Sequence, residues 1–246
     1  MKGVVLAGGL GTRMYPVTKV VNKHLLDVFD EPMIAYPIKT LAGAGISEIT
    51  VVTQDTAVSQ FKELLGDGSD YGVSLTFAAQ PAGDLGIADA IGRAERIVGG
   101  GPIVTILGDN IFQDDLTPFV EQFSAQDKGA KILLKQVAPD DATRFGVVEV
   151  SGGKILGIEE KPSKPKSNLI VTGCYMYDDR VFDFIRTLEP SGRGELEVTD
   201  VNNAYIQEGT MTSNTLVGWW TDAGTPASKL KASMMVALEK GVNFHR

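Results

Sequence analysis

Short apolar runs that are rich in β-branched residues alternate with segments of helical periodicity through the first half of the chain. The apolar runs predict strands at residues 3–6, 49–53, 75–78 and 103–107, and the periodic segments predict helices at residues 33–44, 58–65, 88–98 and 116–125. Pro32 marks the expected start of the first helix, and Gly43 and Gly45 mark its end. Such alternation is typical of βαβ units around a mostly parallel sheet.

Beyond about residue 130 the predicted strands become shorter and follow one another more closely. Strands are expected at residues 132–137, 146–150, 154–159 and 170–177, and helices at residues 180–188, 198–208 and 227–239. The turn Ser151-Gly152-Gly153 predicts an antiparallel hairpin, and Thr225-Pro226 suits the start of the last helix. We therefore expect one α/β domain over residues 1–246, with a Rossmann-like, mixed but mostly parallel sheet and a smaller β-containing lobe.

The composition and charge of the chain argue against nucleic acid and membranes as its partners. The net charge of −8 argues against a general nucleic-acid surface, which depends on clustered Lys and Arg. No apolar run approaches the roughly 18 residues that would span a bilayer, and the N-terminus does not read as a secretory signal. Cys174 is the only cysteine and lies in an apolar run, so we expect a buried side chain and a protein of the reducing cytoplasm.

A glycine-rich segment follows the first predicted strand directly. It reads Gly8-Gly9-Leu10-Gly11-Thr12-Arg13, and glycine lets backbone N–H groups approach a polyphosphate closely. Arg13 and Lys23 would add positive charge. The spacing fits neither the dinucleotide fingerprint, because Met14 stands where a third glycine is needed, nor the Walker A motif, which ends in Gly-Lys-Ser/Thr. By itself the segment fits a tight βα turn equally well.

Two aspartates come at the ends of apolar segments. Asp109 follows the predicted strand at residues 103–107, and Asp222 follows the segment around Trp219 and Trp220 in the same manner. Open α/β folds bind ligands at the carboxyl edge of the parallel sheet, where we expect both carboxylates to lie. Two carboxylates could hold one Mg²⁺, which prefers oxygen ligands. The alternative for each is an ordinary turn residue.

The string LAGGLGTRMYPVTKVVNKHLL resembles the opening signature of the nucleoside-diphosphate-sugar pyrophosphorylases, Gly-Gly-x-Gly-Thr-Arg with a lysine about ten residues later. Further segments resemble the same family in order along the chain: residues 107–110, 144–148, 159–162, 165–168, 193–200 and 219–225. The resemblance spans nearly the whole chain. Within the family, the chain most resembles the short form of the enzymes that use dTTP and glucose 1-phosphate.

The resemblance implies Mg²⁺-dependent transfer of a thymidylyl group from dTTP to glucose 1-phosphate, giving dTDP-glucose and pyrophosphate. It implies a nucleotide-binding half at about residues 1–128 and a sugar-binding half at about residues 129–246. The catalytic residues would be Arg13, Lys23 and Asp109, and the metal ligands Asp109 and Asp222. Nucleotide binding would fall to Gly8, Gly9, Gly11, Thr12, Arg13, Gln80, Gly83 and Gly86. Sugar-phosphate binding would fall to Asn110, Gly146, Glu160, Lys161 and Val171.

Several features depart from the family pattern. The segment at residues 80–88 is one residue longer, so Gly83 and Gly86 compete for the contact to the base. Asp27 and Glu31 add negative charge near the glycine-rich segment, and we expect both to face outward. A UTP-using enzyme is the alternative substrate assignment, because UTP shares the imide edge of dTTP. The alternative from another functional class is a non-catalytic nucleotide-sugar sensor. Assembly into a homo-oligomer also remains possible.

Overall fold

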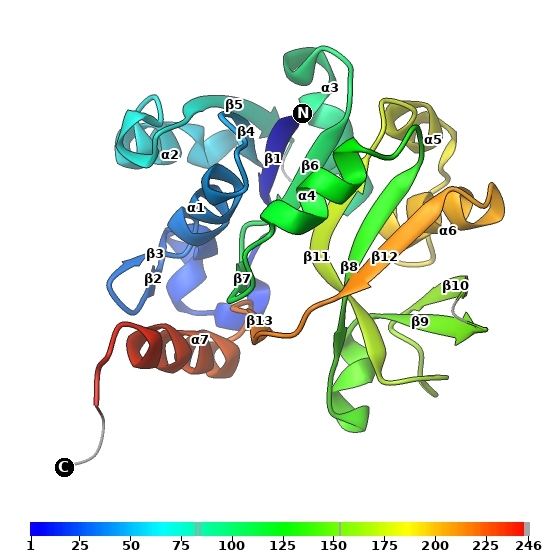
Figure 1. The fold of residues 1–246 in the computed structure, drawn as a ribbon. Helices are drawn as coiled ribbons and strands as arrows, with labels where there is room; N and C mark the ends of the chain where they lie inside the picture. Colours follow the sequence, from blue (N-terminus) through cyan, green and yellow to red (C-terminus); the bar gives the residue numbers. More distant parts are fainter. Residues whose placement is uncertain (82, 84, 153, 244–246) are drawn as a thin grey trace.

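The computed structural model describes residues 1–81, 83, 85–152 and 154–243, and its course is drawn in Figure 1. Nine of the described strands form one mixed sheet. They are β1 (Lys2–Ala7), β4 (Glu48–Gln54), β5 (Ser74–Gln80), β6 (Ile103–Leu107), β8 (Ala130–Gln136), β9 (Gly146–Ser151), β10 (Lys154–Glu160), β11 (Leu169–Tyr177) and β12 (Met211–Thr215). The order is β10-β9-β11-β6-β1-β4-β5, and β8 pairs with both β11 and β12.

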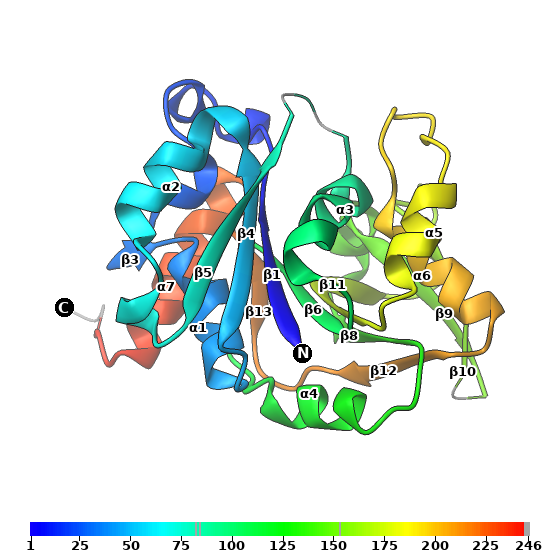
Figure 2. The same ribbon diagram turned by 90° about the horizontal axis from the view of Figure 1, so that it is seen from above.

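Helices cover both faces of this sheet. They are α1 (Ala35–Gly43), α2 (Val58–Leu65), α3 (Ile87–Val98), α4 (Thr117–Ser124), α5 (Val181–Thr187), α6 (Val198–Gln207) and α7 (Pro226–Glu239). Figure 2 shows α1 and α2 on one face and α3, α5 and α6 on the other. Successive side chains of β1 alternate between the two cores, since Val5 packs in one and Val4 and Leu6 pack in the other. Both faces of β1 are therefore buried, which explains its unbroken apolar sequence.

Most of the parallel pairs of the sheet come from the N-terminal half, as predicted, and one more joins β12 to β8 in the C-terminal half. β1 pairs in parallel with β4 and β6, and β4 pairs in parallel with β5. The register sets Leu6 opposite Leu107, so β1 and β6 end at the same edge. The segments that follow these two strands, including Gly8 and Asp109, are thereby brought together at the carboxyl edge.

The C-terminal half adds antiparallel pairs, also as predicted. β11 runs antiparallel to β6, β8 and β9, and β9 forms an antiparallel hairpin with β10. The expected cap of α7 is confirmed: the side chain of Thr225 accepts from the backbone of Ser228, and Pro226 occupies the first helical turn. The described chain thus has the mixed α/β fold that its sequence predicts.

Two small sheets lie outside the main one and were not predicted. β2 (Asp27–Val28) pairs with β3 (Glu31–Pro32), and β7 (Asn110–Phe112) pairs antiparallel with β13 (Trp220–Asp222). Val28 of β2 and Ile111 of β7 pack with α7 in a third core. Asp222 ends the apolar segment β13 and lies at the carboxyl edge of the parallel sheet, as predicted, although β13 itself belongs to a two-stranded sheet. Asp222 reaches that edge because it pairs with Asn110.

The start of the first helix also differs from the prediction. Pro32 lies in β3, and α1 begins at Ala35. The backbone N–H groups of Met33 and Ile34 donate to the carbonyls of Leu26 and His24 at 2.8 and 2.9 Å, so tertiary contacts hold these residues outside the helix. The predicted end is confirmed, because α1 stops at Gly43 and Gly45 follows with a φ of +80°.

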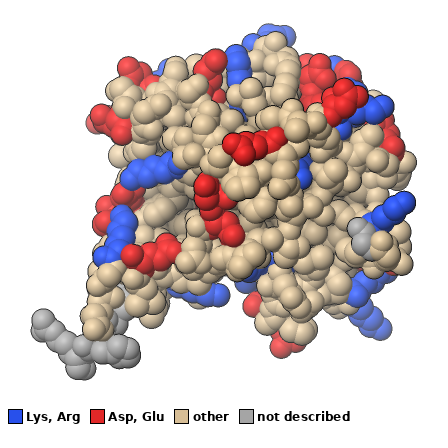
Figure 3. Space-filling view, in the orientation of Figure 1, with Lys and Arg blue, Asp and Glu red and all other residues tan. Residues whose placement is uncertain are grey.

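Within the described residues, no helix combines the length and the apolar character that a membrane crossing would need. On the face drawn in Figure 3, Lys and Arg side chains are interspersed with Asp and Glu, and they do not gather into one basic surface.

Candidate active site

A cleft of about 520 Å³ opens at the carboxyl edge of β1 and β6. This volume lies within the range of ordinary small-molecule sites. The predicted site residues that line it are Gly8, Gly9, Arg13, Lys23, Gln80, Gly86, Asp109, Asn110, Gly146, Glu160, Lys161, Val171 and Asp222. Of the other predicted residues, all within the described chain, Gly11, Thr12 and Gly83 do not line it.

The glycine-rich segment bends sharply after β1. Gly11 adopts a φ of +64°, and its carbonyl accepts from the hydroxyl of Thr18 at 2.6 Å. A Cβ on Gly11 would lie 3.2 Å from the side chains of Thr18 and Lys23. Gly11 therefore shapes the turn from behind, while Gly8 and Gly9 present their backbone to the cleft and the exposed Arg13 reaches its edge.

Lys23 and Asp109 form a buried ion pair at the base of the cleft. Lys23 Nζ lies 2.6 Å from Asp109 Oδ2, and the two side chains are only 11% and 9% exposed. Asn110 donates to the second oxygen, Oδ1, at 2.9 Å. Burial alone would raise the pKa of Asp109, but the positive charge of Lys23, with the hydrogen bonds from Lys23 and Asn110, holds it well below its usual range. Asp109 is therefore a carboxylate at neutral pH.

His24 packs behind this pair. Its ring Nδ1 lies 2.8 Å from Asn22 Oδ1, and a Cβ on Gly108 would come within 2.8 Å of the ring. Burial, helped by the charge of Lys23, lowers the pKa of His24 to about 3. The ring is therefore neutral at physiological pH and packs against Gly108, beside Asp109, without adding charge to the site.

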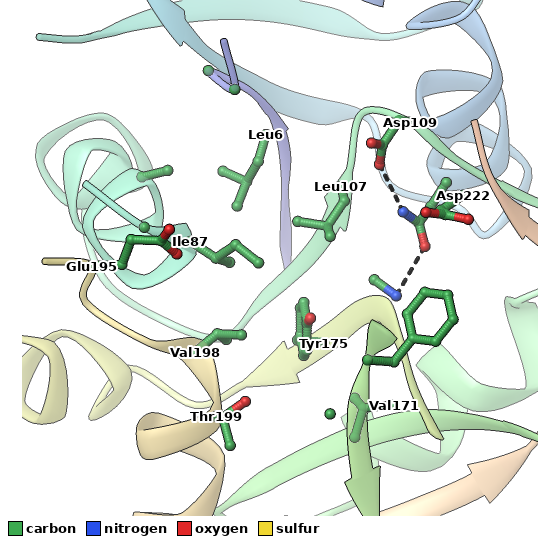
Figure 4. Close-up of a pocket in the computed structure, with 18 of the residues that line it drawn as sticks. Leu6, Ile87, Leu107, Asp109, Val171, Tyr175, Glu195, Val198, Thr199 and Asp222 are labelled. Atoms are coloured by element: carbon green, nitrogen blue, oxygen red, sulfur yellow. Dashed lines mark hydrogen bonds between the residues drawn. The ribbon is translucent and has the colours of Figure 1, made fainter. Parts of the chain in front are cut away.

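Asp222 faces Asp109 from the end of β13. Arg144 Nη2 donates to its two oxygens at 3.2 and 3.1 Å. Burial and the negative charge of Asp109 raise the pKa of Asp222, against the opposing charges of Arg144 and Arg13. Figure 4 shows both carboxylates on one side of the cleft, across from Val198 and Thr199. Two like charges are therefore held close together in a sheltered site.

This donor set fits a single Mg²⁺. Among the described residues no group of three or more His, Cys, Asp or Glu could enclose a metal by itself. Mg²⁺ commonly takes one or two carboxylates and fills its remaining positions with substrate phosphates and water. A divalent cation between Asp109 and Asp222 would also relieve the repulsion that raises the pKa of Asp222.

The opposite end of the cleft carries Glu160 and Lys161. Thr199 donates its hydroxyl to Glu160 Oε2 at 2.7 Å, and Lys161 Nζ lies 3.4 Å from Glu160 Oε1. Lys161 adopts a φ of +43°, fixed by a hydrogen bond from its N–H to the carbonyl of Phe145 at 3.0 Å. An unfavourable backbone conformation at a cleft residue is typical of functional sites.

Asn110 connects three elements around the cleft. Its Oδ1 accepts from the N–H of Gly173 at 2.9 Å and from the indole N–H of Trp220 at 2.8 Å, while its Nδ2 donates to Asp109. Trp220 is buried and meets Phe145 edge to face at 5.4 Å, so it packs the wall of the cleft. Asn110 thus positions Asp109 relative to β11 and β13.

The sequence assigned no role to Arg144 or Arg193. Arg144 binds Asp222 and stacks on Phe145, with its guanidinium 5.0 Å from the ring centroid. Arg193 lies 2.8 Å from Glu197 and 3.7 Å from Glu160. Both belong to segments that resemble the family, but Asp222 and Glu160, their partners in the cleft, come from distant parts of the chain.

The two added acidic residues near the glycine-rich segment face outward, as predicted. Asp27 is exposed and pairs with Lys229 at 3.2 Å, and Glu31 pairs with Lys39 and Lys240. Neither lines the cleft. Their charges are therefore balanced on the surface and do not oppose an anionic ligand.

Comparison with known proteins agrees with this geometry. The nucleotidyl transferase family matches residues 2–239. A glucose-1-phosphate thymidylyltransferase from Neisseria meningitidis serogroup A is 44% identical over 250 residues, covering 100% of this chain and 86% of the relative. The Haloferax volcanii low-salt glycan biosynthesis nucleotidyltransferase Agl11 is 40% identical over 244 residues, covering 98% and 68%.

Solved structures show the same fold. A Bacillus anthracis protein, provisionally named a glucose-1-phosphate thymidylyltransferase and crystallised with sucrose, aligns with a TM-score of 0.91 and 48% identity, covering 100% of this chain and 98% of that one. A UDP-glucose pyrophosphorylase complexed with UDP-glucose aligns with a TM-score of 0.84 over 97% of this chain and 98% of that one. Its 22% identity supports the likeness of fold alone.

Proposed function

The chain belongs to the nucleotidyl transferase family, and we propose that it transfers a thymidylyl group from dTTP to glucose 1-phosphate with the help of Mg²⁺. The products are dTDP-glucose and pyrophosphate. The observation that carries this proposal is that one cleft joins the Lys23, Asp109 and Asp222 end to the Glu160 and Lys161 end. Relatives that share 44% of their residues with the whole chain bear the name of this activity.

The reaction needs no protein nucleophile. A phosphate oxygen of glucose 1-phosphate forms a bond to the α-phosphorus of dTTP, and the bond from that phosphorus to the bridging oxygen breaks, so that pyrophosphate leaves with the electron pair. Cys174 is fully buried, which raises the pKa of its thiol, and it takes no part. A buried thiol also suits the reducing cytoplasm, where we place the reaction.

The charged end of the cleft handles the triphosphate. Arg13 neutralises the departing pyrophosphate, and Lys23 stabilises the negative charge at the α-phosphate. Lys23 is already fixed by Asp109 at 2.6 Å, so its position does not have to be reorganised during the reaction. Mg²⁺, held by Asp109 and Asp222, would supply further neutralisation of the phosphates.

The other end of the cleft handles the sugar phosphate. Lys161 pairs with its phosphate, and Glu160 accepts hydrogen bonds from sugar hydroxyls, as a carboxylate can from a diol. Asn110 and the backbone at Gly146 and Val171 complete this end. Holding both substrates in line converts a bimolecular encounter into a reaction within one complex.

Gln80 selects the base in this proposal, together with the backbone of Gly86. We favour Gly86 over Gly83 because Gly86 lines the cleft. UTP presents the same imide edge, and a methyl group in an apolar pocket is worth only ~10- to 200-fold in discrimination. Some use of UTP is therefore expected.

The test is a pyrophosphate-release assay with glucose 1-phosphate, Mg²⁺ and each nucleotide in turn. We expect the highest kcat/KM with dTTP, and we expect chelation of Mg²⁺ or Asp109→Asn to abolish turnover. Asp70→Asn, at an exposed carboxylate that does not line the cleft, is the control. A preference for UTP would overturn the substrate assignment, and tight nucleotide binding without turnover would favour the sensor.

A further inference from the structure

The amide of Gln80 is held in one of its two orientations. Gln80 ends β5 and is only 4% exposed, but it lines the cleft. Its Nε2 lies 2.9 Å from Asp89 Oδ2. A carboxylate can accept a hydrogen bond but cannot donate one, so the NH₂ group of Gln80 must face Asp89. The carbonyl oxygen Oε1 is thereby turned away from Asp89.

Asp89 is fixed in its turn by Arg93. Both lie on α3, one turn apart, and Arg93 contacts both oxygens of Asp89, with Nη2 2.8 Å from Oδ1 and Nε 3.3 Å from Oδ2. The Asp89 side chain is 13% exposed. This contact at both oxygens keeps the carboxylate in place as the acceptor for Gln80.

The freed oxygen of Gln80 lies against the glycine-rich segment. A Cβ on Gly8 would come within 2.1 Å of Gln80 Oε1, so the oxygen occupies space that only a glycine leaves open. Within the described part of the chain no group donates a hydrogen bond to this oxygen. Gly8 and Gln80 both line the cleft, which therefore presents a hydrogen-bond acceptor here.

A donor lies in the same cleft. Gly86 precedes α3 and has no side-chain cap, and its N–H donates to no described group. An acceptor and a donor that line one cleft suit the imide edge of thymine or uracil, which pairs a ring N–H with a carbonyl. Cytosine presents the reverse, an unprotonated ring nitrogen beside an amino group. The donor and acceptor of the site therefore suit the imide edge of thymine or uracil and not the edge of cytosine.

We propose that Asp89, held by Arg93, is a positioning residue for base selection: it keeps the carbonyl of Gln80 directed at the ring N–H of the nucleobase and so excludes cytosine. This inference rests on the proposed function, in which Gln80 contacts the base. Without Asp89 the side-chain amide of Gln80 could rotate by half a turn and donate a hydrogen bond from its NH₂ group to the ring nitrogen of cytosine.

The test is Asp89→Asn, which keeps the shape but allows either amide orientation. We expect the ratio of kcat/KM for dTTP to kcat/KM for dCTP to fall about 10-fold, since the variant relaxes one of the two mismatched hydrogen bonds that separate the bases, the one made by Gln80. The loss should come from KM for dTTP, with kcat within about twofold, because the contact is remote from the phosphates. Binding of dTDP and dCDP by calorimetry should shift in the same ratio.

Glu95→Gln is the matched control. Glu95 lies on the same helix and pairs with Arg186 at 2.7 Å, away from Gln80, so the nucleotide ratio should not change. Asp89→Ala serves as a second variant should Asp89→Asn fail to fold. An unchanged ratio in a folded Asp89 variant of an enzyme that prefers dTTP overturns this inference alone. Failure of the wild type to use dTTP overturns the proposed function instead.

Discussion

Removing Lys23 should destabilise the fold as well as abolish activity, because the Lys23 and Asp109 side chains are 11% and 9% exposed and 2.6 Å apart. Lys23→Met leaves the Asp109 carboxylate buried with Asn110 as its remaining close partner. Breaking one side of a buried pair typically costs ~3–5 kcal/mol. A chain of this length loses about 2–4 °C of Tm per kcal/mol, so we expect Tm to fall by ~6–20 °C.

The double variant Lys23→Met/Asp109→Asn separates this cause from lost packing. Because the double variant leaves no unpaired carboxylate, its loss of unfolding free energy, measured in urea, should be smaller than the sum of the two single losses by at least about 1 kcal/mol. Lys229→Met breaks the exposed pair with Asp27, which is 71% exposed, and should cost under ~1 kcal/mol. The reasoning is refuted if Lys23→Met unfolds like wild type or if the single losses simply add.

Three further variants address other parts of the molecule. Gly8→Ala places a Cβ 2.1 Å from Gln80 Oε1 and should raise KM for dTTP by ~10-fold, with unchanged circular dichroism. Glu160→Gln should raise KM for glucose 1-phosphate by ~10-fold or more but leave KM for dTTP nearly unchanged, and equal effects on both would contradict its place at the sugar end. Burial raises the pKa of Asp178, but hydrogen bonds from Arg180 and others lower it overall below 3.8. Its stabilisation is thus present above pH 3.8 and lost as the pH falls through the lower folded pKa. Asp178→Asn should therefore be destabilised relative to wild type at pH 7 in urea unfolding, and this difference should shrink as the pH falls below 3.8.

Local patterns were sufficient for most of the fold. β1 is apolar on both faces because both faces are buried, and α3 repeats its buried positions, Ala90, Ile91, Ala94 and Val98, at helical spacing. The β9–β10 hairpin followed from the turn at Gly152. These elements depend on neighbours in the sequence, so their signals could be found there.

The elements that were missed depend on distant partners. β7 and β13 have three residues each and hold together by pairing across more than a hundred residues, so neither carries a periodic signal. Pro32 was misplaced because its flanking backbone bonds to the loop before it. Arg144 could be seen in its motif, but its contact with Asp222 lies 78 residues away. The position of a charged side chain requires the tertiary structure.

The β7–β13 pairing also dictates when the site can form during synthesis. Trp220 reaches Asn110 across 110 residues of chain, and Asp222 arrives with it. A ribosome makes about 5–20 residues per second, so for ~5–20 s the emerging chain can carry β1, β6 and Asp109 without Asp222. The nascent protein would therefore hold only half of the proposed cation site, and it should not bind Mg²⁺-nucleotide productively until the segment around β13 has emerged and docked.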